Sequence, residues 1–470
     1  MLRRLMLLFP ALLALLIMVA LLHPTAAQAQ TTLAVSGHQL LVNGLPFIVR
    51  GVNYKPTPYT GATNWGDDWT LNSALTAADF AKMQEMGVNT IRVYVTYERL
   101  FNNWDNHNPT NDTVVAAELS RYQTVLAQAQ SRGISVIMNY WLPYGLDYTQ
   151  ATPRSWHKLR FRKIINTFKN LATYPNVLMW AFGNENNLNR GPLSNAQLFA
   201  YYGEAISEAK AQADTTHPYT VVLGDDLSIN NSTLTNSAST VDIWSLNIYQ
   251  TSQGYTNIIS SYSLSKPLLF SEFGADAYNT NTGSEDQASQ ANFYTDRWSN
   301  YIRPNLSATN AGNKLLGGAA FEWNDEWWKA AGANNVHDTG GWSGNVPPDN
   351  FLNEEWFGLS TALPDGSSGP RSYRQAFGAL KALWATLPGV TFYQNSNYGG
   401  TASGLKAKGN YASLPGDVPN DWMSSLKVPA GWIVDAYADG NFTGAVCTYT
   451  ADTSWVGTAC NDVMSSFKIH

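Results

Sequence analysis

The segment Trp-Ala-Phe-Gly-Asn-Glu-Asn at residues 180–186 places Glu185 directly after an apolar, strand-like run. Residues 270–276, Phe-Ser-Glu-Phe-Gly-Ala-Asp, repeat this arrangement around Glu272. A (β/α)8 barrel presents its reactive groups at the C-terminal ends of its parallel strands. The two segments therefore predict such a barrel, with both glutamates at its mouth.

Strand-like runs and amphipathic helices alternate on both sides of these segments. A hairpin with a turn at Asn43 and Gly44 comes first, and Gly87 and Gly133 directly follow two of the helices, where glycine commonly ends a helix. The predicted barrel strands are a run ending at Tyr54 and the runs Thr90–Val95, Ser135–Asn139, Val177–Phe182, Thr220–Leu223, Ile243–Ile248, Pro267–Ser271 and Leu315–Phe321. The predicted helices include Ala77–Met86, Ala116–Ser131, Trp156–Leu171, Asn195–Ala213 and Tyr373–Trp384. This alternation predicts an α/β fold, a closed parallel (β/α)8 TIM barrel.

An open, doubly wound sheet is the alternative topology. It would need a glycine-rich phosphate loop after an early strand, and the chain contains no Gly-x-Gly-x-x-Gly or Walker-type segment. The acidic balance, 35 Asp and Glu against 29 Lys and Arg, disfavours nucleic acid as a partner. The chain has 17 Trp and 24 Tyr, and aromatic rings of this kind can stack on sugars, so we expect a polysaccharide as the partner. We also expect a monomer.

The N-terminus has the pattern of an export signal. Arg3 and Arg4 precede the apolar run Leu5–Leu22, and Ala27-Gln28-Ala29 has the small residues of a cleavage site. An uncleaved membrane anchor is the alternative, since the run is just long enough to span a bilayer. We predict a signal peptide at residues 1–29, a secreted product and no membrane contact after cleavage. In an oxidising compartment Cys447 and Cys460, the two cysteines of the chain, are expected to form a disulfide.

The composition changes at Leu387-Pro388-Gly389, where the helical pattern gives way to short β-like runs. Two segments then recur in order: Tyr393–Gly400 returns as Tyr437–Gly444, and Asn420–Ser425 returns as Asn461–Ser466. We predict a catalytic barrel at residues 30–387 and a small all-β Greek-key sandwich with two repeated motifs at residues 388–470.

The two glutamates suggest glycoside hydrolysis. A retaining enzyme needs one carboxylic acid to protonate the leaving oxygen and one carboxylate to attack the anomeric carbon, with the two groups about 5 Å apart. Carboxylates that end opposite strands of one barrel can converge in this way. No cofactor is expected for this chemistry.

Gly183-Asn184-Glu185 and Ser271-Glu272-Phe273-Gly274 resemble the signatures of clan A glycoside hydrolases, in particular the β-galactosidase/β-glucuronidase group and the β-1,3-glucanosyltransferases. The resemblance covers Leu33 to Trp384 and implies that Glu185 is the acid/base and Glu272 the nucleophile. It also implies that Arg92 keeps Glu272 ionised, Asn184 holds the sugar 2-hydroxyl, Tyr249 hydrogen-bonds the nucleophile and Trp323 floors the subsite of the reacting sugar. Asn53, Tyr54 and Trp141, also at strand ends, are candidate sugar contacts, with ordinary packing as the alternative.

These residues predict a secreted retaining β-glycanase or β-transglycosylase, with β-1,3-glucan as the first substrate. Chitosan is the second, because Glu322, Asp325 and Glu326, together with Asp225, Asp226 and Asp276, would make the mouth acidic if they pointed inward. A catalytically inactive carbohydrate-binding surface protein is the rival of another class.

The repeated C-terminal segments resemble the two Greek-key motifs of βγ-crystallin domains. The resemblance implies calcium binding by the recurring segments, through Asn420, Asp421, Ser424, Asn461, Asp462 and Ser465, all of which offer the oxygen ligands that calcium prefers. The alternative is a sandwich whose Asn-Asp pairs only shape turns. The module could also hold polysaccharide through exposed Trp422, Trp432 or Trp455.

Overall fold

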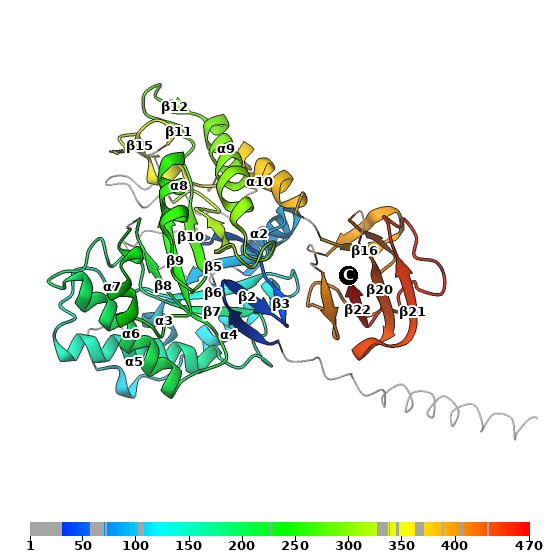
Figure 1. Ribbon diagram of the computed structural model, residues 1–470, viewed down its shortest axis with the longest axis horizontal. Helices are drawn as coiled ribbons and strands as arrows, with labels where there is room; N and C mark the ends of the chain where they lie inside the picture. Colours follow the sequence, from blue (N-terminus) through cyan, green and yellow to red (C-terminus); the bar gives the residue numbers. More distant parts are fainter. Residues whose placement is uncertain are drawn as a thin grey trace, which may run out of the picture.

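The computed structural model describes residues 31–56, 70, 73–101, 108–225, 227–326, 337, 339–344, 347–361, 371–387, 389–403, 406, 408–429 and 432–470. The predicted signal peptide and Pro388, the first residue of the predicted second domain, lie outside this part of the chain. Figure 1 shows a barrel surrounded by helices and, beside it, a smaller all-β region that contains the C-terminus. Within the described residues, none of the helices combines the length and the apolar character needed to span a bilayer.

Eight parallel strands close the barrel in the spatial order β10-β13-β4-β5-β6-β7-β8-β9. Their bounds are β4 Val49–Asn53, β5 Thr90–Tyr94, β6 Ser135–Tyr140, β7 Val177–Phe182, β8 Tyr219–Leu223, β9 Ile243–Ile248, β10 Leu268–Phe273 and β13 Leu315–Ala320. Nearly every residue in these strands is buried, because helices cover the outer face and side chains fill the interior. The predicted (β/α)8 fold is confirmed, and β7 and β9 have the predicted bounds.

Helices lie around the outside of the barrel (Figure 1). Their bounds are α2 Ser73–Met86, α3 Tyr97–Leu100, α4 Ala116–Gln130, α5 Ala151–Phe168, α6 Asn195–Gln212, α7 Ser232–Ser237, α8 Ser252–Ser261, α9 Gln287–Asp296 and α10 Gln375–Ala385. Helix α5 begins at Ala151 rather than at the predicted Trp156. Pro153 lies in its first turn, where the missing N–H of proline breaks no hydrogen bond, so the helix can begin before it.

A small hairpin sheet covers the end of the barrel at which the strands begin. Its strands are β1 Leu33–Ser36, β2 Gln39–Val42 and β3 Leu45–Pro46. Leu40 is fully buried there and packs in one cluster with strand residues such as Val49 and Ile243. Asn43 and Gly44 have φ angles of 53° and 78°, as the predicted hairpin turn requires. Apolar side chains therefore fill this end of the barrel.

The C-terminal region forms two small antiparallel sheets over a core of its own, which confirms the predicted small all-β region. The strand orders are β17-β16-β19 and β18-β22-β20-β21. The bounds are β16 Thr391–Asn395, β17 Gly399–Ala402, β18 Gly409–Tyr411, β19 Ser425–Lys427, β20 Val434–Asp439, β21 Thr443–Tyr449 and β22 Ser466–Ile469.

The two copies of the repeated segment have the same backbone conformation. Asn397 and Asn441 are left-handed, with φ angles of 55° and 56°. Gly400 and Gly444, three residues later in each copy, have φ angles of 72° and 77°. Asparagine and glycine tolerate this conformation better than other residues. The internal duplication in the sequence therefore extends to the structure.

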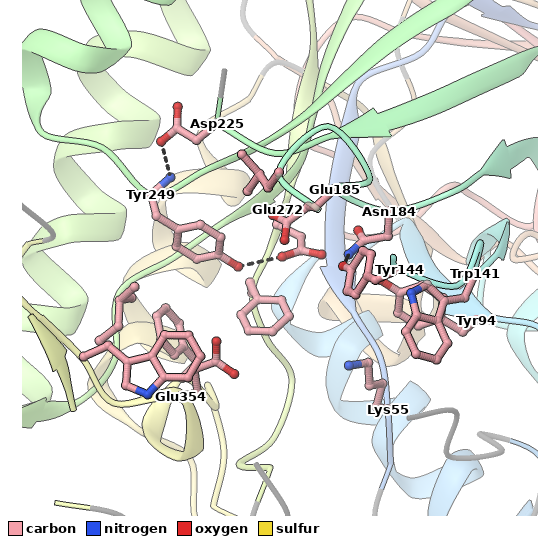
Figure 2. Close-up of a pocket in the computed structure, with 15 residues that line it drawn as sticks. Lys55, Tyr94, Trp141, Tyr144, Asn184, Glu185, Asp225, Tyr249, Glu272 and Glu354 are labelled. Carbon is pink, nitrogen blue, oxygen red and sulfur yellow. Dashed lines mark hydrogen bonds between the residues drawn. The ribbon is translucent and has the colours of Figure 1, made fainter. Parts of the chain in front are cut away.

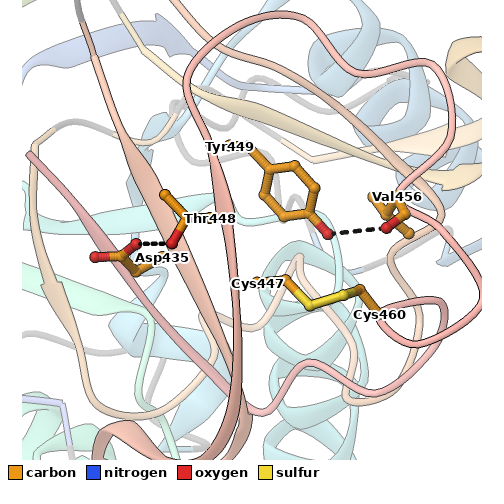
Figure 3. The surroundings of a disulfide bond; sticks show 6 residues. All are labelled: Asp435, Cys447, Thr448, Tyr449, Val456 and Cys460. Atoms are coloured by element: carbon orange, nitrogen blue, oxygen red, sulfur yellow. Dashed lines mark hydrogen bonds between the residues drawn. A yellow bond between two sulfur atoms is a disulfide. The ribbon is translucent and has the colours of Figure 1, made fainter.

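Cys447 and Cys460 form the predicted disulfide, which Figure 3 shows. Cys447 belongs to β21, and Cys460 lies in the loop that follows. The hydroxyl of Tyr449, the last residue of β21, donates a hydrogen bond to the carbonyl of Val456 in this loop at 3.3 Å. The loop is therefore held both by the disulfide and by the hydrogen bond from this buried ring.

Candidate active site

A pocket of about 390 Å³ lies at the C-terminal ends of the barrel strands (Figure 2). Most of the strands contribute a side chain at or just beyond their last residue. The lining consists of Lys55, Tyr94, Trp141, Tyr144, Asn184, Glu185, Leu188, Asp225, Tyr249, Glu272, Phe321, Trp342, Leu352, Glu354 and Phe357. The structure thus brings Glu185 and Glu272 into one pocket, as the two opening segments predicted.

Glu185 has a left-handed backbone conformation, with φ 51°. It follows Gly183, which has φ 81° and where an added Cβ would lie 2.6 Å from the side-chain oxygen of Asn186. That oxygen accepts a hydrogen bond from the backbone N–H of Asn184 at 3.1 Å, and the amide of Asn186 donates to the carbonyl of Leu142 at 2.9 Å. A left-handed glutamate costs roughly 1–3 kcal/mol, which these contacts must offset. The tight turn directs Glu185 into the pocket.

Glu272 is the second-to-last residue of β10, where the strand register with β9 shifts between Phe270 and Glu272. Irregularities of this kind re-aim a side chain at the rim of a barrel. Its Oε1 accepts a hydrogen bond from Nη1 of Arg92 at 2.5 Å, and its Oε2 accepts one from the hydroxyl of Tyr249 at 2.7 Å. Burial, with Glu272 nearby, raises the pKa of Tyr249 well above its usual value, so the phenol remains a hydrogen-bond donor.

Arg92 is buried beneath the pocket and contacts several polar side chains. Nη1 donates to Oδ1 of Asn53 at 2.9 Å, and Nη2 donates to Oδ1 of Asn184 at 2.7 Å. Nε donates to Oδ1 of Asn139 at 3.0 Å. The guanidinium fork is thereby held against Glu272. Asn53 therefore lies behind the pocket as a partner of Arg92 rather than among the lining residues.

Two predicted sugar contacts are wrong, because their side chains point away from the pocket. Tyr54 is fully buried, and its hydroxyl donates to Asp79 at 3.0 Å. Trp323 is also fully buried, and its ring packs against Tyr373 and Phe377. After β13 the ring that lines the pocket is that of Phe321, so the direction of the side chain, and not its place after a strand, decides its role.

Trp141 lines the pocket as predicted, and other lining residues have no counterpart in the prediction. Tyr94 is the last residue of β5, and Tyr144 lies in the loop after β6. Their position at or after the end of a strand was the available signal. Asn247 was also missed, although it lies two residues before Tyr249, and its amide donates to Oε1 of Glu185 at 3.0 Å.

The acidic segment after β13 does not make the mouth acidic. Glu322, Asp325 and Glu326 are buried and do not line the pocket. Asp325 pairs with Arg374 at 2.6 Å, and Glu326 pairs with Lys55 at 2.9 Å.

Asp276 is also buried and does not line the pocket, whereas Asp225 does, and Asp226 lies outside the described residues. The buried acids therefore give no support to a cationic amino sugar as the substrate.

The two Asn-Asp segments of the C-terminal region lie side by side. Asp421 and Asp462 are both left-handed, with φ angles of 52° and 53°. The N–H of Asp421 donates to the carbonyl of Met464 at 3.3 Å, and the N–H of Asp462 donates to the carbonyl of Met423 at 3.2 Å. Burial, opposed by Asn420 and aided by Asp462, raises the pKa of Asp421.

The remaining predicted ligands are arranged with the same symmetry. Asn420 and Asn461 each donate to the aspartate that follows them, at 2.8 Å in both copies. Ser424 and Ser465 are held through their backbone N–H groups by β-strand carbonyls, those of Tyr393 and Tyr437. Among the described residues, no three His, Cys, Asp or Glu side chains gather as a metal-binding group. A cation here would depend mainly on amide, hydroxyl and carbonyl oxygens.

Comparison with known proteins finds relatives of the part of the chain that forms most of the barrel. Residues 23–303, more than half of the 470-residue chain, match the family described as Glucanosyltransferase. The 1,3-beta-glucanosyltransferase GAS4 of Saccharomyces cerevisiae is 25% identical over 255 residues, which are 50% of each protein, so the chain spans about half the length of this relative. The 1,3-beta-glucanosyltransferase PGA4 of Candida albicans is 24% identical over 403 residues, which cover 79% of this chain and 81% of PGA4.

A solved structure resembles a smaller part of the chain. A single-site mutant of a βγ-crystallin domain from Clostridium beijerinckii is 55% identical over 17% of this chain and 99% of that domain, with a TM-score of 0.17.

Proposed function

Because the chain belongs to the glucanosyltransferase family of glycoside hydrolases, we propose that it cleaves a β-1,3-linked glucan and transfers the released piece to a second glucan chain. Family membership confirms the predicted resemblance to clan A enzymes. The observation that carries the proposed activity is the placement of Glu185 and Glu272 in one pocket, with Glu272 held by Arg92 and Tyr249.

The proposed reaction has two steps. In the first, Glu272 attacks the anomeric carbon while Glu185 donates a proton to the leaving oxygen, and a glycosyl–enzyme ester forms. In the second, Glu185 removes a proton from the incoming hydroxyl, which displaces Glu272. Arg92 and Tyr249 hold both oxygens of Glu272 in position for the attack. Asn184, which lines the pocket and accepts a hydrogen bond from Arg92, would contact the sugar 2-hydroxyl.

The incoming hydroxyl belongs to water in a hydrolase and to a sugar in a transferase. The rings of Trp141, Tyr144 and Trp342 line the pocket and offer stacking faces for a second glucan chain. A bound acceptor reacts faster than water because its hydroxyl is already oriented. This apolar lining supports transfer as the main outcome.

The proposal is tested by mass spectrometry of the products from laminarin oligosaccharides, with chitosan and cellulose oligosaccharides in parallel. Products longer than the starting laminarin oligosaccharide are expected from the wild type and not from Glu185→Gln or Glu272→Ala. Glu118→Gln, on the outer helix α4, serves as the matched control and should behave as wild type. Shortened products alone would make the protein a hydrolase, and unchanged β-1,3-glucan would exclude the proposed substrate.

We further propose that the protein is secreted and that its C-terminal region is a βγ-crystallin-like module with two calcium sites. The paired Asp421 and Asp462 segments, with matched backbone conformations, support the module. Residues Asn420, Asp421, Ser424, Asn461, Asp462 and Ser465 would supply oxygens to the cations. Calorimetric titration of the full chain with calcium should release or absorb heat, and the heat should be lost in an Asp421→Ala/Asp462→Ala double variant.

A further inference from the structure

Asn247 is a fully buried amide in β9, and its side chain contacts groups in the turn after β7 and in β10. Nδ2 lies 3.0 Å from Oε1 of Glu185 and 3.1 Å from Oδ1 of Asn184. Oδ1 lies 2.8 Å from the hydroxyl of Ser271, the residue directly before Glu272. One side chain therefore joins the segment of the acid/base to the segment of the nucleophile.

These contacts determine the orientation of the amide. Oδ1 of Asn184 already accepts a hydrogen bond from Arg92 at 2.7 Å, so the atom of Asn247 that faces it is best satisfied as a donor. The same atom faces a carboxylate oxygen of Glu185, which accepts. The other end then faces the Ser271 hydroxyl, which can donate to it. A flipped amide would place an oxygen against two acceptors.

We propose that Asn247 is a positioning residue that holds Oε1 of Glu185 as the unprotonated oxygen, so that the catalytic proton is carried on Oε2. A protonated oxygen is a poor hydrogen-bond acceptor, and the N–H of Asn247 is fixed on Oε1. The donor also favours the ionised form of Glu185, which the second step needs. This inference rests on the proposed role of Glu185 as the acid/base.

A buried amide with a purely structural role has different neighbours from those of Asn247. Asn176, near the start of β7, is also buried, and its Nδ2 donates to the backbone carbonyls of Leu126 and Ile134. Such an amide stabilises the fold and faces no reacting group. The donors of Asn247 instead point at Glu185 and at a partner of Arg92, which makes Asn176 a matched control.

Other charged or titratable groups also face Glu185 and contribute to its titration. They lie on β5 and β10, directly after β9, and in the segments after β4, β6, β8 and β15 Phe351–Leu352, and they are Tyr94, Glu272, Tyr249, Lys55, Tyr144, Asp225 and Glu354. A variant of Asn247 leaves all of them in place, so a change in titration after that substitution reports the lost amide.

The test begins with a measurement that needs no activity. Side-chain ¹³C NMR of glutamate-labelled full-length protein follows the titration of Glu185, whose signal is assigned by its loss in Glu185→Gln. Asn247→Ala should raise the titration midpoint by about one pH unit, because a donor to the charged form is lost. Asn247→Asp, which keeps the shape but adds a like charge, should raise it further. Asn176→Ala should leave it unchanged, and an unchanged midpoint in both Asn247 variants would overturn the inference.

Kinetics provide the second readout. On a natural glucan, kcat/KM of Asn247→Ala should fall about 10- to 100-fold and its alkaline limb should move upward, as expected for a mispositioned general acid. A glycosyl fluoride needs no proton on its leaving group and should lose less than about 3-fold. Equal losses on both substrates would contradict a role through Glu185. A wild type inactive on every glycan would instead refute the proposed function, while the NMR titration would still decide the role of Asn247.

Discussion

Two acidic residues near the end of β10 show how neighbours decide the behaviour of a carboxylate. Glu272 meets a guanidinium and a phenol, and both of its oxygens accept hydrogen bonds from them. Asp276 is fully buried and accepts hydrogen bonds from the backbone N–H groups of Tyr278 and Asn353. Burial raises the pKa of Asp276 to about 7, with the backbone donors opposing the shift and the charge of Asp349 adding to it.

The raised pKa of Asp276 predicts a pH-dependent stability. Between the ordinary pKa of about 4 and the folded value of about 7, the folded state binds a proton that the unfolded state has lost. The contribution is therefore fully present below about pH 4 and is lost as the pH rises through about 7. Asp276→Asn should remove this component, which amounts to at most about 4 kcal/mol. Urea unfolding at pH 4.5 and 7.5 checks it, and an equal pH dependence in wild type and variant would contradict the prediction.

At the scale of elements, a short hairpin beyond β13 forms one wall of the pocket. It consists of β14 Trp342–Ser343 and β15 Phe351–Leu352, which pair antiparallel. Trp342 lines the pocket although 69% of its surface is exposed. A large ring that is held at a pocket and left open to solvent is suited to stacking against a sugar.

Trp342→Ala should therefore weaken glucan binding without changing the chemical step. We expect KM for long laminarin oligosaccharides to rise about 5- to 20-fold and kcat to stay within about 2-fold, since a stacking contact is worth roughly 1 kcal/mol or more. Val114→Ala, which trims an exposed apolar side chain that does not line the pocket, is the control. A fall in kcat with unchanged KM would show that the hairpin acts on the reacting centre.

At the scale of the whole molecule, buried charged side chains connect the C-terminal region to the end of the barrel at which the strands begin. Lys406 pairs with Asp417 at 2.7 Å, and both side chains are almost fully buried. Asp417 packs against Gly133, where an added Cβ would lie 2.6 Å from its carboxyl carbon. Burial lowers the pKa of Arg50, at the start of β4, to about 10, and the nearby charge of Asp417 opposes this shift. The two regions therefore depend on each other.

Removing Asp417 should destabilise both regions together. In Asp417→Ala, Lys406 and Arg50 lose a buried counter-charge, a change that typically costs about 3–5 kcal/mol. One cooperative thermal transition should remain, at a lower temperature than in the wild type. Glu85→Gln, which removes two surface ion pairs, those with Lys82 and Lys381, should have little effect. Two separate transitions in the variant, with the barrel transition unchanged, would show that the regions are independent.

The strand order, the two glutamates at strand ends and the disulfide could all be predicted from the sequence. These features depend on local signals: apolar runs such as Val177–Phe182, and cysteines close together in the chain. The repeated C-terminal segments were visible for the same reason, and Asn397 and Asn441 have the same conformation in the structure.

Only the tertiary structure decided which side chains face the pocket. Tyr54 and Trp323 follow strands as Trp141 does, yet they point into the surrounding packing, and Asp325 turns toward Arg374. The sequence by itself determined the elements, because strand and helix periodicity is local. Side-chain direction at a strand end depends on bulges, turns and partners far away in the chain, such as Asn247 beside Glu185, and only the closed barrel brings these together.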